Sequence, residues 1–70
     1  MEITTLVEQH YESLYRFAFR LTGKAADAED LTQQTYLDAQ RKRDTLREPD
    51  KARAWLFMIV RNLYRRRLRD

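Results

Sequence analysis

Hydrophobic and polar residues recur at helical spacing along most of the chain, and a glycine and a proline divide this pattern into three segments. Gly23 separates residues 4–22 from residues 27–46, and Pro49 precedes residues 51–69. No stretch alternates with a period of two over the length that a strand needs. The pattern therefore predicts an all-α fold, a compact three-helix bundle.

The first segment, residues 4–22, carries apolar residues at alternating spacings of four and three, which line one side of a helix. These residues are Val7, Tyr11, Leu14, Ala18 and Leu21. Thr5 and Glu8 match a capping box, which predicts the start of the helix. Gly23 is suited to its end because glycine readily adopts the left-handed conformation.

The second segment, residues 27–46, is predicted to begin with Asp27 as its N-cap. At about 100° per residue its core face consists of Ala28, Leu31, Thr35 and Ala39. The opposite, outward arc holds Asp30, Gln33, Gln34, Leu37 and Arg41. Leu37 is therefore an apolar residue at the centre of a polar arc. The spacing leaves two interpretations equally open, a solitary exposed leucine or the apolar centre of a protein-docking patch.

The third segment, residues 51–69, is predicted to follow Asp50 as N-cap. Its core arc consists of Ala52, Leu56, Ile59, Val60 and Leu63. The other arc forms a stripe of Lys51, Trp55, Met58, Asn62, Arg65, Arg66 and Arg69. Such a stripe suits nucleic acid, because arginines neutralise phosphates, rings stack on unpaired bases and asparagine hydrogen-bonds to base edges. Against this, a tryptophan at helical spacing is more often a core residue, and a basic helix face is often only solvated.

Charge is distributed unevenly along the chain. Residues 1–40 carry three basic and seven acidic side chains, a net of −4, whereas residues 41–70 carry eleven basic and four acidic ones, a net of +7. The C-terminal part is thus predicted to bind a polyanion.

Composition limits the remaining classes of protein. Seventy residues suffice for one domain, assigned here to residues 1–70. The chain has no cysteine, which excludes disulfides and thiolate metal sites. Its longest strongly apolar run, residues 55–60, is far shorter than the roughly 20 residues of a membrane span, and no signal peptide is recognisable. A soluble cytoplasmic protein is predicted.

Catalytic chemistry finds little support in the sequence. His10, the only histidine, lies near Ser13 and Glu12, but such a cluster on a helix is usually solvated surface. The acidic residues 27–30 are explained by the positive end of a helix dipole rather than by a metal ion. We therefore predict that the chain is not an enzyme and has no cofactor or metal.

Three stretches of the sequence resemble a known family. They are LYRFAFRLTG, AEDLTQQTYLDA and RAWLFMIVRNLYRRRLRD. In order and spacing they are similar to region 2 of the extracytoplasmic-function (ECF) sigma factors, which belong to the sigma-70 family of bacterial RNA polymerase. The resemblance runs from about Leu6 to Arg69. Its most specific pieces are Asp30-Leu31 followed by Gln33, the tract Ala54-Trp55-Leu56, and Arg61-Asn62.

The resemblance implies a helical domain that acts in transcription initiation. The outward arc of the second segment resembles the surface that grips the coiled-coil clamp helices of the polymerase β′ subunit. The third segment and the 41–50 loop resemble the part that opens the promoter −10 element by capturing a flipped-out base of the non-template strand. Predicted polymerase-binding residues are Asp30, Gln33, Gln34, Leu37 and Arg41. Predicted DNA-binding residues are Lys51, Trp55, Arg61, Asn62, Arg65, Arg66 and Arg69.

Departures from the family pattern modify these expectations. Gln34 stands where glutamate is usual, Gln40 where an aromatic residue is common and Met58 where the residue is frequently basic. The clamp contact is therefore expected either to be weaker or to depend more on Leu37 and Asp30. Family members are commonly held inactive by an anti-sigma factor, which we expect as a further partner. The helix-turn-helix domain that reads the −35 element has no counterpart in this sequence. Two interpretations stay open: an excised fragment of a longer protein, which we favour, or a chain that works with only half of the family's promoter contacts.

Two other functions stay open on the sequence. One is a protein-interaction module that binds polymerase or an anti-sigma factor without sequence-specific DNA binding. The other is a generic basic helical RNA binder. Strand and sequence preference separate them, because only a melting domain should prefer a single-stranded −10-like oligonucleotide over its scramble.

Overall fold

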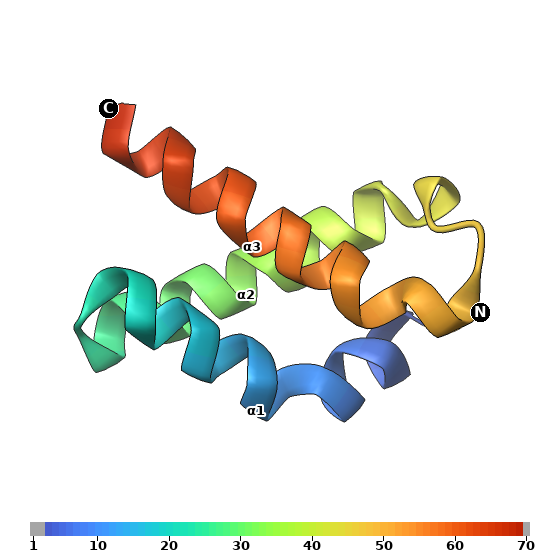
Figure 1. The fold of residues 1–70 in the computed structure, drawn as a ribbon, viewed down its shortest axis with the longest axis horizontal. Coiled ribbons are helices and arrows are strands. Elements are labelled where there is room, and N and C mark those ends of the chain that lie inside the picture. Colours follow the sequence, from blue (N-terminus) through green and yellow to red (C-terminus); the bar gives the residue numbers. More distant parts are fainter. Residues whose placement is uncertain (1–2, 70) are drawn as a thin grey trace.

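The chain folds into three helices joined by short connections, as a computed structural model shows for residues 3–69, which are the residues that the structure describes (Figure 1). The elements in chain order are α1 (Ile3–Thr22), α2 (Ala25–Arg41), the 3-10 turns η1 (Arg43–Thr45) and η2 (Pro49–Lys51), and α3 (Ala52–Arg69). No strand occurs within this range, and the predicted all-α fold is confirmed. None of the described helices is long and apolar enough to span a membrane.

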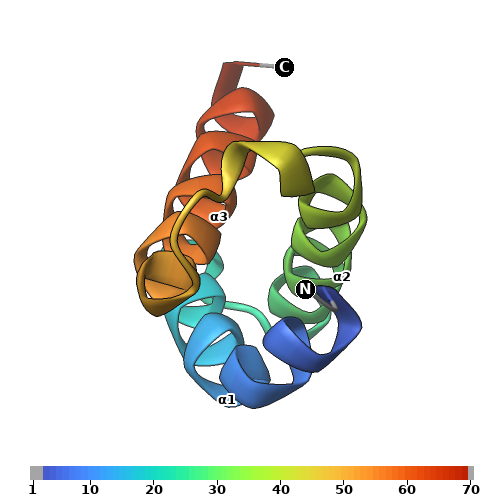
Figure 2. The ribbon, with the colours of Figure 1, turned by 90° about the vertical axis from the view of Figure 1, so that its right-hand side faces the viewer.

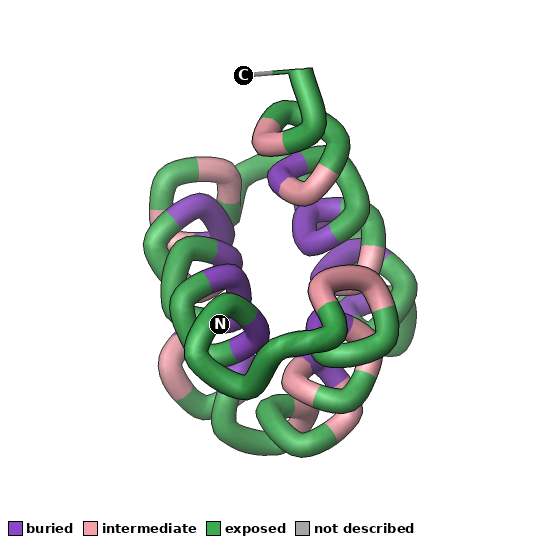
Figure 3. Tube along the Cα trace, turned by 90° about the vertical axis from the view of Figure 1, so that its left-hand side faces the viewer, coloured by how far each residue is buried: buried purple, intermediate pink, exposed green. Residues whose placement is uncertain are grey.

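The helices surround one hydrophobic core, and the buried parts of each helix face the interior (Figures 2 and 3). Every predicted core position of the second and third segments is buried: Ala28, Leu31, Thr35, Ala39, Ala52, Leu56, Ile59, Val60 and Leu63. In α1 the prediction is confirmed at Val7, Leu14 and Ala18. It is wrong at Tyr11, which is 41% exposed, while Leu21 is half-buried and packs against the core.

The predicted helix starts require correction. α1 already contains Thr5 and Glu8, so these residues do not form a capping box at its start. α2 begins two residues earlier than predicted, because the extended Lys24 directly after the Gly23 turn is its N-cap. Asp27 lies in the first turn, where its carboxylate still suits the helix dipole. Asp50 lies within η2, whose first residue is Pro49, and is therefore not the N-cap of α3.

α2 ends at Arg41 rather than at residue 46. The N–H of Lys42 closes the last turn on the carbonyl of Asp38 at 2.9 Å, and the Thr45 hydroxyl donates to the Lys42 carbonyl at 2.7 Å. Leu46 follows Ala28 by 18 residues, about five helical turns, so it is in phase with the core of a continuous helix. The turn returns Leu46 to that same core, where it is buried. Periodicity alone does not distinguish these two routes.

Gly23 ends α1 in the left-handed conformation that the sequence predicts. Its φ is 73°, and its N–H donates to the carbonyl of Phe19 at 2.7 Å. A Cβ atom added at this position would meet no atom within 4 Å. Backbone strain is therefore the only local obstacle to a larger residue.

Replacing Gly23 should weaken the fold through this strain. Gly23→Ala is expected to lower the free energy of unfolding by about 1 kcal/mol. Gly23→Asn should lower it less, because asparagine tolerates the left-handed region better than alanine. Urea denaturation followed by circular dichroism measures both values. Equal losses in the two variants would contradict this explanation.

Candidate polymerase and nucleic-acid interfaces

The outward face of α2 lies on the molecular surface, as its helical phase predicts. Its five members are all exposed: Asp30, Gln33, Gln34, Leu37 and Arg41. Leu37, 59% exposed, lies between two hollows. One, of about 370 Å³, opens toward α1 and is also lined by Tyr11 and Tyr36. The other, of about 510 Å³, opens toward α3 and is also lined by Leu63 and Arg66. Leu37 therefore forms an apolar ridge with a hollow on either side.

Asp30 of this face forms an ion pair with a residue of another helix. Arg67 of α3 donates from Nη2 to Oδ2 of Asp30 at 2.6 Å, which links the start of α2 to the end of α3. The Asp30 side chain is still 63% exposed, so the pair contributes only about 0.2–1 kcal/mol. The sequence prediction missed Arg67, because it lies outside the basic stripe.

A buried carboxylate supports the other end of the outward face. Asp38 accepts a hydrogen bond from Arg41 and pairs with Lys42 Nζ at 3.2 Å. Burial acts to raise the pKa of the Asp38 carboxyl, but the hydrogen bonds and charges of Arg41 and Lys42 outweigh it and hold that pKa below its usual value. The Arg41 guanidinium is thereby oriented. An acidic residue followed by basic residues three and four positions later is the signal that could have revealed this cluster.

The ionised state of Asp38 should make the stability of the fold depend on pH. Because its pKa is lower in the folded than in the unfolded chain, its contribution is fully present above the unfolded pKa of about 4. It is lost as pH falls through the folded pKa. Asp38→Asn should lower the free energy of unfolding at pH 7 by about 1–3 kcal/mol and flatten its decline in acid. Urea denaturation at a series of pH values measures both effects.

Asp44→Asn is the matched control, since it removes the same charge at an exposed position of η1. It should leave the stability at pH 7 nearly unchanged. An acid profile of Asp38→Asn as steep as that of the unaltered chain would contradict the role assigned to Asp38.

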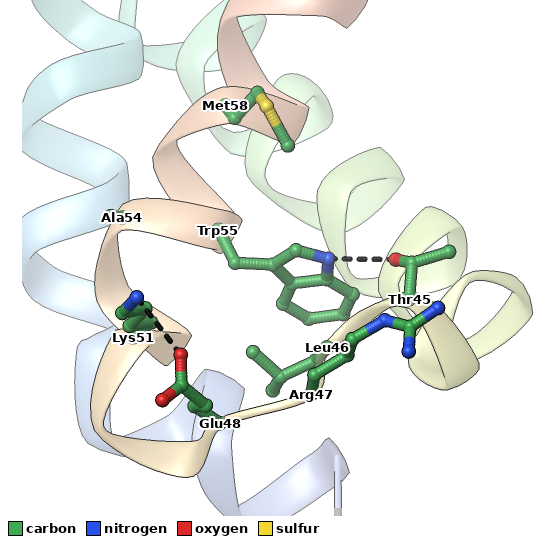
Figure 4. A pocket seen from close by; sticks show the side chains of 8 residues that line it. All are labelled: Thr45, Leu46, Arg47, Glu48, Lys51, Ala54, Trp55 and Met58. Carbon is green, nitrogen blue, oxygen red and sulfur yellow. Dashed lines mark hydrogen bonds and ion pairs between the residues drawn. The ribbon is translucent and has the colours of Figure 1, made fainter.

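Trp55 is a core residue rather than an exposed member of the stripe. Its side chain packs in the core and the residue is 8% exposed. The indole N–H donates to Thr45 Oγ1 at 2.9 Å, as Figure 4 shows. Because Thr45 belongs to η1, this hydrogen bond joins α3 to the η1 turn. The Thr45 hydroxyl in turn donates to the Lys42 carbonyl. Trp55 therefore occupies a core position, and its part in DNA binding stays a prediction.

The loop and the start of α3 line an open pocket of about 330 Å³ (Figure 4). Its lining residues are Thr45, Leu46, Arg47, Glu48, Lys51, Ala54, Trp55 and Met58. Leu46, Trp55 and Met58 supply apolar surface. Glu48 and Lys51 pair at 2.8 Å, with both side chains largely exposed, so the pocket combines an apolar wall with donors and an acceptor. This volume lies at the lower end of the range for small-molecule sites.

The structure brings only part of the predicted DNA-binding set to this pocket. Lys51 and Trp55 line it, whereas Asn62 is exposed one turn beyond Met58 on α3. The basic members farther along the helix are all exposed: Arg61, Arg65, Arg66 and Arg69. The sequence analysis did not predict the loop side chains Arg47 and Glu48 as part of the site. An irregular loop has no periodicity that would indicate which side chains face a pocket.

These features define a small all-α domain. One helix presents a polar outward face with an apolar centre, and another presents an exposed basic face. The chain belongs to the Sigma-70 region 2 family, whose model matches residues 6–70. The resemblance noted in the sequence is thereby confirmed.

The relatives of the chain are ECF RNA polymerase sigma factors. SigL of Mycobacterium tuberculosis is 44% identical over 59 residues, which cover 83% of this chain and 33% of SigL. SigE of Mycolicibacterium smegmatis is 42% identical over 59 residues, covering 84% and 23% of the two chains. EcfG of Rhodopseudomonas palustris is 45% identical over 53 residues, covering 76% and 29%. The chain thus spans at most about a third of these relatives. No solved structure gives a significant match.

Proposed function

We propose that this chain is the region 2 module of an ECF sigma factor, which docks on the β′ clamp helices of RNA polymerase through α2 and binds the single-stranded promoter −10 element with α3 and its preceding loop. The module would act in transcription initiation, without catalysis. The observation that carries the proposal is the pocket beside Trp55, which continues into an exposed basic stripe in a chain of this family.

The pocket has the chemistry to hold an unpaired base. A flipped-out base loses its stacking partners, which costs a few kcal/mol, and an apolar wall offsets part of this cost. Leu46, Met58 and the accessible edge of Trp55 supply such a wall. Arginines along α3 contact phosphates, and these contacts add affinity without sequence information.

The outward face of α2 has the anatomy of a docking site. An apolar side chain surrounded by polar ones loses water when a partner covers it, and such central residues contribute most of the binding energy. Leu37 is the apolar centre, and the hollows on both sides can receive side chains of a partner helix. Arg41, held by Asp38, offers an oriented donor at the edge.

Leu37→Ala should weaken binding to core polymerase by about 1–2 kcal/mol while changing the free energy of unfolding by less than about 0.5 kcal/mol. Leu68→Ala is the matched control, because Leu68 is a comparably exposed leucine, on α3. It should leave polymerase affinity unchanged. Anisotropy titration with labelled chain and purified core enzyme measures the affinity. Equal losses from both variants would remove Leu37 from the docking site.

Asn62 should contribute to sequence preference on the DNA strand, whereas the arginines should contribute affinity without sequence preference. Against a strand selected from a single-stranded promoter library, Asn62→Ala should cost about 1–3 kcal/mol, with little effect on its scramble. Arg65→Gln should weaken both strands alike and reduce the log–log salt slope by about 0.7. Fluorescence titrations at several salt concentrations measure these effects.

Three outcomes separate this proposal from its alternatives. Equal losses on the matched and scrambled strands in Asn62→Ala would mean that Asn62 braces the fold instead of reading a base. No preference of the unaltered chain for any strand would favour a generic RNA binder. Binding to polymerase with no DNA binding at moderate salt would favour a pure interaction module.

A further inference from the structure

A small basic hollow between α1 and α3 takes no part in the docking face or in the pocket beside Trp55. It has a volume of about 170 Å³ and is lined by Ser13, Arg16, Phe17, Arg20, Arg53 and Phe57. All of these residues belong to α1 or α3, so the hollow lies between these two helices and takes none of its lining from α2. Its polar groups are three guanidinium groups, which only donate hydrogen bonds, and one hydroxyl.

Two stacked phenylalanine rings line this basic hollow. Phe17 and Phe57 stack with their ring centroids 4.9 Å apart and their planes 16° from parallel. The guanidinium of Arg53 lies over the Phe57 ring, 5.0 Å from its centroid. A guanidinium stacked on an aromatic ring has less orientational freedom to lose when it binds an anion. Arg53 is therefore already ordered for such binding.

The positive charge of the hollow is only partly balanced. Arg16 pairs with Glu12 at 2.5 Å, and both side chains are more than 70% exposed. Among residues 3–69, Arg20 and Arg53 form no ion pair. Neighbouring like charges repel one another and oppose folding. An anion held between these arginines would relieve that repulsion.

We propose that Arg16, Arg20 and Arg53 form a seat for a phosphate group of DNA. Phosphate accepts paired hydrogen bonds from guanidinium forks, which suits a site that consists of donors. DNA is favoured over another anion because the hollow is followed along α3 by further arginines. Arg61 lies two turns beyond Arg53, and from there exposed arginines continue to the C-terminal end of the helix. The seat would thus extend a basic surface that α3 already presents.

The position of the seat also fits the path of a strand bound in the pocket beside Trp55. Ala54, an exposed neighbour of Arg53, lines that pocket, so the pocket and the hollow lie on adjacent sides of the first turn of α3, since successive helix residues are about 100° apart. A strand leaving the pocket would pass part of the way around one helix, about 10 Å wide, to reach the arginines. This path rests on the proposed function, whereas the phosphate seat itself does not.

The test measures binding of the 70-residue chain to labelled single-stranded (dT)16 and to a 16-base-pair duplex at several salt concentrations. Arg20→Gln/Arg53→Gln removes the two unpaired arginines and leaves the Arg16–Glu12 pair intact. Each lost phosphate contact on the single strand should reduce the log–log salt slope by about 0.7, and the affinity at 0.1 M salt roughly fivefold. Arg53→Lys, which keeps the charge but not the fork, should retain the slope and lose part of the affinity.

Lys24→Gln is the matched control, because it removes one positive charge at the exposed start of α2. It should leave the salt slope unchanged. A double variant that behaves like Lys24→Gln with both DNA forms would overturn the proposal. Loss with the single strand supports the seat on the strand path, and loss confined to the duplex supports a seat for duplex phosphates. Poly-glutamate is added as a competitor of the labelled DNA. If the double variant binds DNA as the unaltered chain does but is displaced less readily by poly-glutamate, the DNA assignment would be overturned in favour of an acidic protein.

Two controls keep the result independent of folding and of the proposed function. Arg20→Gln alone leaves the stacked phenylalanine rings intact, and its circular dichroism melting curve should match that of the unaltered chain. The double variant should also keep any preference for a selected strand over its scramble. If that preference is absent from the unaltered chain but the salt slope still changes, the proposed function fails and the phosphate seat stands.

Discussion

The hydrogen bond from the Trp55 indole to Thr45 is the contact on which the shape of the pocket beside Trp55 depends. It joins the first turn of α3 to the 3-10 turn that ends the α2 region, and Thr45 passes the link on to the Lys42 carbonyl. The loop of residues 46–48 is thereby held at a fixed distance from α3. Most of the Trp55 ring is buried in the core, and its remaining edge lines the pocket.

A small three-helix core determines how many surfaces the chain can offer. Each helix buries one side against the other two, and its remaining circumference stays in contact with solvent. α2 uses that surface for a polar arc with one exposed leucine, and α3 uses it for arginines. The acidic first half and the basic second half of the sequence meet where Arg67 of α3 pairs with Asp30 of α2. Arg16 and Arg20 of α1 likewise line one hollow with Arg53 of α3.

Helical phase was predictable from the sequence, whereas helix ends and the pocket were not. Core positions of α2 and α3 follow from a period of 3.6 residues, which also identified the exposed state of Leu37. The end of α2 depends on tertiary contacts of Thr45 and Leu46, and Leu46 is in phase with either route of the chain. The Asp30–Arg67 pair joins residues 37 positions apart, which no local pattern reveals. Contacts between residues far apart in the sequence therefore account for the Asp30–Arg67 pair and for the end of α2.

The outward face of α2 and the basic helix α3 share a border, which has consequences for any partner that binds one of them. Arg66 of α3 lines the same hollow as Leu37 and Arg41 of α2. A helix laid along Leu37 would therefore lie within reach of a basic side chain from α3, and an acidic residue on that helix would gain a partner there. Asp38, ionised beneath this border, keeps Arg41 turned toward its carboxylate and so fixes one side of the hollow. Electrostatics at this junction would favour a partner whose apolar contact residue is flanked by carboxylates.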